Sequence, residues 1–218
     1  MELRNLIRSI DWAFLENTLR RLAAVLLCLT VHETCHGLAA YALGDPTAKE
    51  QRRLSLNPLR HIDWLGLGMM LAVGFGWARA VPVDPRHFRR PKQGMALTAL
   101  AGPASNFLLA LLAVFLSREI YLHAANPGPA WAALFEFLLY ALAPLSIGLG
   151  LFNLLPIPPL DGAKVLGAFL PDRAYFGLMR YERYGMLVLL ALSWLGVTGG
   201  FISGAILRVY QFMFELFY

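Results

Sequence analysis

The motif HETCH at residues 32–36 lies inside a hydrophobic run, 22–43, that is long enough to cross a membrane. The hydrocarbon core of a bilayer takes about 20 helical residues. Imidazole and carboxylate groups are costly at that depth, so polar side chains inside a spanning segment are usually functional. This one motif therefore demands a fold in which both histidines and the glutamate face protein or a bound group rather than lipid.

Three further stretches can span a membrane, and none contains Asp, Glu, Lys or Arg: 94–117, 137–160 and 184–207. The chain is 58% hydrophobic and 15% charged, whereas soluble domains are nearer 45–50% and about 25%. We expect an all-α polytopic membrane protein with four to five transmembrane helices, folded as one membrane-embedded domain over residues 1–218. The lipid bilayer is then its surroundings. The net charge of +5 reports topology rather than nucleic-acid binding.

A shorter hydrophobic stretch, WLGLGMMLAVGFGWA at 64–78, has 15 residues and four glycines. It is too short for an ordinary transmembrane helix. Irregular backbone at membrane depth is tolerated where protein or a water-filled cavity surrounds it. The stretch therefore predicts a re-entrant or edge-strand element, with a short fifth span as the alternative.

The basic residues are unevenly distributed between the predicted spans. Residues 45–92 hold nine Lys and Arg, and 161–183 hold four, whereas 118–136 hold one. With four spans, the two basic regions share one side, and the positive-inside rule makes that side the cytoplasm. The four arginines before the first span oppose this orientation. On balance we expect a multi-pass protein of the cell membrane, whose active site opens toward the cytoplasmic side.

HETCH has the residue types and spacing of a metal site. His32 and His36 are four apart, which places them on one face of a helix, one turn from each other. Two imidazoles so arranged can bind one Zn²⁺, and Glu33 can reach a metal-bound water as general base. A short HExxH motif also arises by chance in soluble helices. Here it stands in a run that otherwise excludes charge, which favours the metal site.

A catalytic zinc needs a third protein ligand and leaves a fourth position for water. The candidate is Asp161, at the end of the segment NLLPIPPLDG, 153–162. Its three prolines do not fit a helix interior, so the chain should unwind there and deliver a side chain at a new angle. The same residues could form an exit loop in which the aspartate caps the next helix. The presence of HETCH favours the ligand.

Together, HETCH and NLLPIPPLDG resemble the two metal motifs of the site-2 protease family of intramembrane zinc metalloproteases. Further agreement comes from GDPTAKEQRRLSLNPLRHIDWLG, GWARAVPVDPRHF and ALAGPASN, which look like the compact bacterial and archaeal branch without a PDZ domain. The resemblance covers about residues 22–170. It implies one zinc per chain, held by His32, His36 and Asp161, with Glu33 as the catalytic residue.

The resemblance also implies the reaction, hydrolysis of peptide bonds within or next to transmembrane helices of a membrane protein substrate. Two asparagines, Asn106 and Asn153, match family positions that hold substrate backbone near the metal. Each has an equal structural explanation: Asn106 follows small residues suited to close helix packing, and Asn153 can join two helices by a hydrogen bond. The sequence carries no signal for an oligomeric state.

Two other functions fit a membrane protein with this motif. A catalytically silent family member could act as a membrane partner-binding protein, but Glu33 is intact. A zinc carrier or channel would spread polar residues along several spans as a path. Here three of the four spans carry no charge, so the polar groups are expected to gather at one site.

Overall fold

The computed structural model describes residues 11–73, 77–124, 128–180, 184–185, 187–189, 191 and 197–218. Its α-helices are α2 (Trp12–Ala42), α3 (Thr47–Glu50), α4 (Trp64–Val73), α5 (Pro91–His123), α6 (Pro129–Glu136), α7 (Ala143–Asn153), α8 (Asp161–Gly167), α9 (Asp172–Arg180) and α11 (Val197–Glu215). A π-helical turn, Phe137–Leu142, joins α6 to α7, and 3₁₀ turns cover Pro58–Arg60 and Pro85–His87. The described residues contain no β-strand, so the predicted all-α class is confirmed.

Three of the described helices are long and apolar enough to cross a membrane: Trp12–Ala42, Pro91–His123 and the continuous helix Pro129–Asn153. They correspond to the first three predicted spans. With 31 and 33 residues, α2 and α5 are about 46 and 50 Å long, longer than the roughly 30 Å hydrocarbon core. Both helices therefore extend beyond it.

The ends of these helices differ from the predicted spans for local reasons. Helix α2 begins ten residues before position 22 because Asp11 caps it, accepting a hydrogen bond from the Phe14 N–H at 3.0 Å. The third helix ends at Asn153 rather than at residue 160, since the prolines that follow cannot continue it. Composition alone marks the apolar part of a helix, not its capped ends.

Of the predicted fourth span, 184–207, residues 186, 190 and 192–196 lie outside the described residues. Where description resumes, α11 continues past residue 207 to Glu215. The stretch predicted as re-entrant begins as α4, whose ten residues measure about 15 Å, half a bilayer core. Ile62, just before α4, and Ala78, after it, form an isolated antiparallel bridge. A count of four to five spans is thus not established, and α4 alone is too short to cross.

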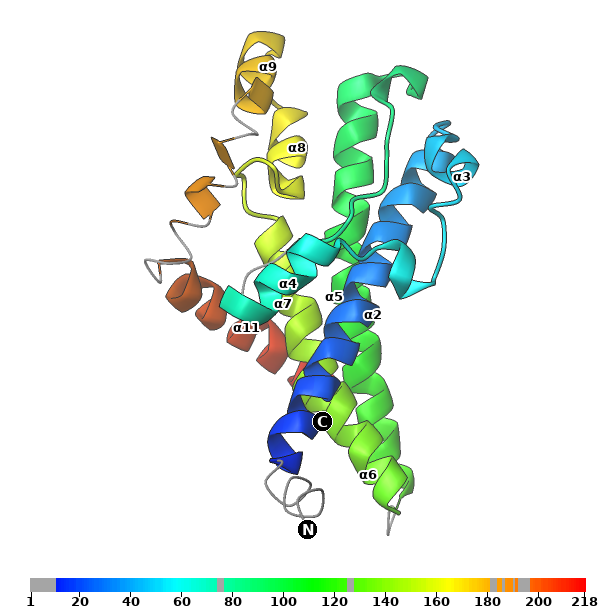
Figure 1. Ribbon diagram of the computed structural model, residues 1–218, viewed down its shortest axis with the longest axis vertical. Helices are drawn as coiled ribbons and strands as arrows, with labels where there is room; N and C mark the ends of the chain where they lie inside the picture. The colour runs from blue at the N-terminus through cyan, green and yellow to red at the C-terminus, as the bar shows by residue number, and fades with distance from the viewer. Residues whose placement is uncertain are drawn as a thin grey trace, which may run out of the picture.

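Helices α2 and α5 lie side by side along the long axis of the molecule, and α7 packs against α5 (Figure 1). Small buried residues line their contact, among them Ala24, Cys28 and Ala110. Small side chains let helix backbones approach closely, as is usual in membranes. Helix α11 also packs against α7. This apolar core begins one turn below HETCH and fixes the distance between α2 and α5 at the site.

Candidate metal centre

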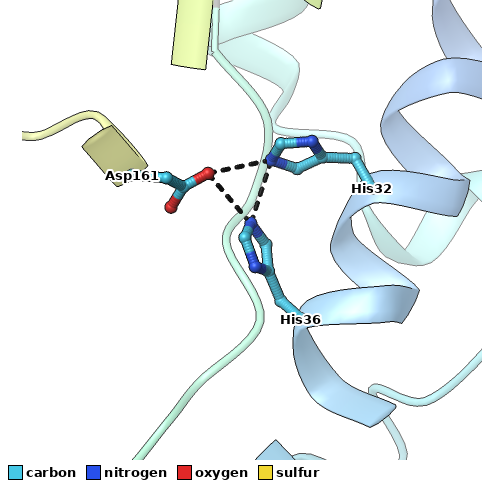
Figure 2. Close-up of side chains that lie close together, drawn as sticks. All are labelled: His32, His36 and Asp161. Carbon is cyan, nitrogen blue, oxygen red and sulfur yellow. Dashed lines mark hydrogen bonds and ion pairs between the residues drawn. The ribbon is translucent and has the colours of Figure 1, made fainter. Parts of the chain in front are cut away.

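The two histidines of HETCH and Asp161 converge on one point (Figure 2). The Nε2 atoms of His32 and His36 are 2.9 Å apart, and Asp161 Oδ2 lies 3.2 and 3.1 Å from them. All three side chains are buried. Among the described residues they form a group that can hold a metal ion. The structure thus brings together the three ligands predicted from widely separated motifs.

The spacing of the three donor atoms fits zinc. With zinc–ligand bonds of about 2.0–2.2 Å, donors at the corners of a tetrahedron lie about 3.3 Å from each other. The observed separations of 2.9–3.2 Å match this value. Two imidazoles and one carboxylate are also a donor set found in catalytic zinc sites, where a fourth position stays open to water.

Each ligand is positioned by a different local feature. Helix α2 is regular through HETCH, so His32 and His36 stack on one face. Asp161 is the first residue of α8, and the chain between α7 and α8 folds back so tightly that a side chain on Gly162 would overlap the Leu154 carbonyl. The alternative of a capping aspartate is not observed: the N-cap of α8 is Leu160, with no side-chain cap bond. The Asp161 carboxylate faces the histidines instead.

Glu33 occupies the next position along α2 and is also buried. Its Oε2 accepts a hydrogen bond of 2.8 Å from the Val81 backbone N–H. Arg53 holds the same segment from behind, because its Nη2 donates to the carbonyls of Arg79 and Ala80 at 2.7 and 3.3 Å. The carboxylate of Glu33 is therefore fixed in place by the irregular segment 77–83.

The ligands and Glu33 open onto a cleft of about 610 Å³. Its walls come from α2, segment 77–83, α5, the end of α7 and the start of α8. Asn153 lies on the wall, and its Nδ2–H donates to the Leu149 carbonyl at 3.0 Å. Asn106 does not line the cleft and is completely buried, with its amide nitrogen 3.1 Å from His32 Nδ1. Its predicted contact with substrate remains a prediction.

Helix α5 and α8 add contacts that sequence reasoning missed. His36 Nδ1 donates to the Thr98 carbonyl at 2.7 Å. Gly102 lies so close to both imidazoles that an added Cβ would overlap the His36 ring. Lys164 Nζ is 3.8 Å from Asp161 Oδ1, the oxygen turned away from the histidines. The sequence carries no signal for the contacts of the Thr98 carbonyl or of Gly102, which has no side chain. The contact of Lys164 could have been predicted, because residues at i and i+3 are neighbours on a helix.

Comparison with known proteins places this site in a family. The profile of peptidase family M50 matches residues 118–196, which include Asp161. A putative zinc metalloprotease of Bacillus subtilis, YwhC, is 38% identical over 168 residues, covering 77% of each chain. The chain belongs to peptidase family M50, the site-2 protease family.

Other relatives agree. The putative zinc metalloprotease Rip2 of Mycolicibacterium smegmatis is 30% identical over 176 residues, covering 78% of this chain and 65% of its own. The zinc metalloprotease MJ0392 of Methanocaldococcus jannaschii is 27% identical over 127 residues, covering 58% and 34%. No solved structure matches the chain at a significant level. The predicted family and enzyme class are confirmed, and the names of the relatives agree with the predicted zinc.

Proposed function

We propose that this M50 peptidase is an intramembrane zinc-dependent endopeptidase that cuts peptide bonds within or next to transmembrane helices. One observation carries the proposal: His32 and His36 from α2 meet Asp161 from α8 at the spacing of zinc ligands, on the wall of a cleft. In this proposal the three side chains hold one Zn²⁺ per chain, and Glu33 is the catalytic residue. Family membership does not favour a silent partner-binding protein.

The chemistry divides between the metal and Glu33. A Zn²⁺ held by His32, His36 and Asp161 would polarise the scissile carbonyl and lower the pKa of the attacking water. Glu33 accepts the proton of that water and passes it to the leaving amine. Its bond from the Val81 N–H restricts the carboxylate to one orientation, so one oxygen stays held while the other is available for the proton.

The substrate imposes a second requirement. A transmembrane helix hides its carbonyls in its own hydrogen bonds, and each unpaired backbone group in lipid costs several kcal/mol. The enzyme must open a few residues and offer new partners. The cleft has room for such a segment, and Asn153 and the irregular segment 77–83 supply polar groups on its walls. We expect the enzyme to hold the opened substrate segment through backbone hydrogen bonds, as a strand added along an exposed edge of the enzyme.

The orientation in the membrane is part of the proposal. The nine basic residues between 45 and 92 flank the end of α2 at which HETCH lies. By the positive-inside rule this end faces the cytoplasm. We place the protein in the cell membrane with the cleft opening toward the cytoplasmic side, the direction from which water enters.

A single substitution tests the proposed reaction. Wild type and Glu33→Gln are reconstituted in liposomes with a panel of reporters, each with one transmembrane helix joining two soluble tags. We expect wild type to cut at least one reporter. Glu33→Gln should lose at least about a hundredfold in rate while zinc content stays equal. Glu50→Gln, at an exposed position on α3, is the matched control and should cut normally.

Two results would contradict the proposal. Cleavage by Glu33→Gln at the wild-type rate would remove Glu33 from the chemistry. Wild-type protein that holds zinc and cuts no reporter would instead support a partner-binding member of the family.

A further inference from the structure

One face of α5 contacts both histidines of HETCH. Thr98, Gly102 and Asn106 are spaced by four residues, which aligns them along a single side of the helix. The Thr98 carbonyl holds His36, the bare backbone at Gly102 admits both rings, and Asn106 meets His32. Because α2 and α5 run antiparallel (Figure 1), His36 meets Thr98 near the start of α5 and His32 meets Asn106 further along it.

The surroundings of Asn106 separate it from any substrate. Its side chain is 0% exposed, and it is not on the wall of the cleft. The amide nitrogen lies 3.1 Å from His32 Nδ1. The amide oxygen has no hydrogen-bond partner in the part of the chain that is described. A buried polar side chain with one partner, the far nitrogen of a metal-ligating imidazole, points to a role toward that imidazole.

The chemistry of a histidine ligand defines that role. His32 presents Nε2 to the other donors, so in the metal-binding tautomer its proton sits on Nδ1 and must be donated. His36 meets the same need through the Thr98 carbonyl. For His32 the hydrogen-bond partner of Nδ1 among the described residues is the Asn106 carboxamide, which can offer its oxygen as the acceptor. A half-turn of the carboxamide exchanges its oxygen and nitrogen, and it breaks no bond of the oxygen, which has no partner among the described residues.

We propose that Asn106 is a positioning residue of the zinc site: its Oδ1 accepts the Nδ1–H of His32 and holds Nε2 toward the metal. The inference rests on the proposed function, since it presumes that His32 binds zinc. It replaces the substrate contact expected from the sequence. Such outer contacts typically change metal affinity by about 10–100-fold when they are removed.

The test compares zinc affinity across four purified proteins by competition with a chelator in detergent: wild type, Asn106→Leu, Asn106→Asp and Ser117→Ala. We expect Asn106→Leu, which keeps the size but no acceptor, to bind zinc about 10–100-fold more weakly. Asn106→Asp restores an acceptor and should stay within about threefold of wild type. Ser117, also fully buried on α5 but hydrogen-bonded to Val114 and Tyr218, is the matched control and should not change zinc affinity.

Thermal unfolding of the same proteins in excess chelator separates positioning from folding. A positioning role predicts that Asn106→Leu and Ser117→Ala differ little in their unfolding midpoints without metal. If Asn106→Leu fails to fold, the role rests on Asn106→Asp, which must then retain zinc near the wild-type level.

The failures are distinguishable. Wild-type protein without zinc would overturn the proposed function itself. Wild-type zinc affinity in Asn106→Leu would overturn only the positioning role, and a raised KM in that variant would return Asn106 to the substrate. Equal loss of zinc in the Leu and Asp variants, with equal loss of stability, would leave Asn106 as a packing residue.

Discussion

The two long helices that enclose the site contribute in opposite ways. Helix α2 supplies two proposed ligands, His32 and His36, and the proposed base, Glu33, at a spacing that can be recognised in the sequence. Helix α5 supplies no ligand, yet it contacts both histidines through a carbonyl, a glycine and an amide. A motif search finds the first helix and overlooks the second. The metal site is therefore a property of the pair of helices, and predictions that separate their contributions test it best.

The largest effect on zinc affinity is expected at Gly102, where the backbone of α5 lies against the histidine rings of α2. In Gly102→Ala the new methyl group would overlap the His36 ring and lie 2.7 Å from the His32 ring. Overpacking of this kind costs about 1–3 kcal/mol of stability, and here it displaces both ligands. We predict zinc affinity lower by at least about a hundredfold, measured by chelator competition.

Gly204→Ala is the matched control, because no atom of the described residues lies within 4 Å of an added Cβ at that position of α11. It should keep zinc and gain up to about 1 kcal/mol of stability. Normal zinc binding in Gly102→Ala would mean that α5 does not set the position of the rings.

A smaller effect, on kcat alone, is expected from a change that loosens Glu33, the proposed base, without touching the ligands. Arg53→Gln removes the donor to the carbonyls of Arg79 and Ala80, and so loosens the segment whose Val81 N–H holds Glu33. We predict kcat for a cleaved reporter lower by about 10–100-fold, with zinc content unchanged because no ligand is touched.

The control for this variant is Arg60→Gln. Arg60 is exposed, and its side chain donates to the Arg52 carbonyl rather than to segment 77–83. Reporter cleavage should be normal there. Loss of zinc together with activity in Arg53→Gln would show that the base and the metal cannot be separated in this way.

The smallest effect is expected at the third ligand. Lys164 is about 30% exposed and lies 3.8 Å from the outer oxygen of Asp161. Partly exposed ion pairs contribute about 1 kcal/mol or less. Lys164→Gln should therefore weaken zinc binding by no more than about fivefold. Lys92→Gln, which breaks the distant pair with Asp172, should leave it unchanged. A loss of fiftyfold or more would make Lys164 as important as the face of α5.

The sequence predicts the ligands because their signals are local. HETCH carries its own helical spacing, and the prolines before Asp161 announce the turn that delivers it. The contacts from α5 depend on which face of one helix meets another, and no local pattern contains that information. For the same reason the sequence left substrate contact and helix packing equally open for Asn106, and it carried no sign of the His32 ring beside that side chain.

The fold shows the same division. Hydrophobicity located the apolar centres of the first three long helices, since lipid and core both require them. It misplaced their ends, because the ends follow from the cap at Asp11 and from the prolines after Asn153. The stretch 64–78 has no periodicity that distinguishes a short helix from a re-entrant loop, and α4 occupies its first ten residues.

The most direct test of the central claim is the zinc content of purified wild-type protein beside that of Asp161→Ala. The account predicts about one zinc per chain in wild type and a loss of most of it in the variant, because Asp161 Oδ2 completes the group with His32 and His36. Full zinc in Asp161→Ala would contradict the proposed ligand set. Wild-type protein purified without zinc would contradict the metal site altogether.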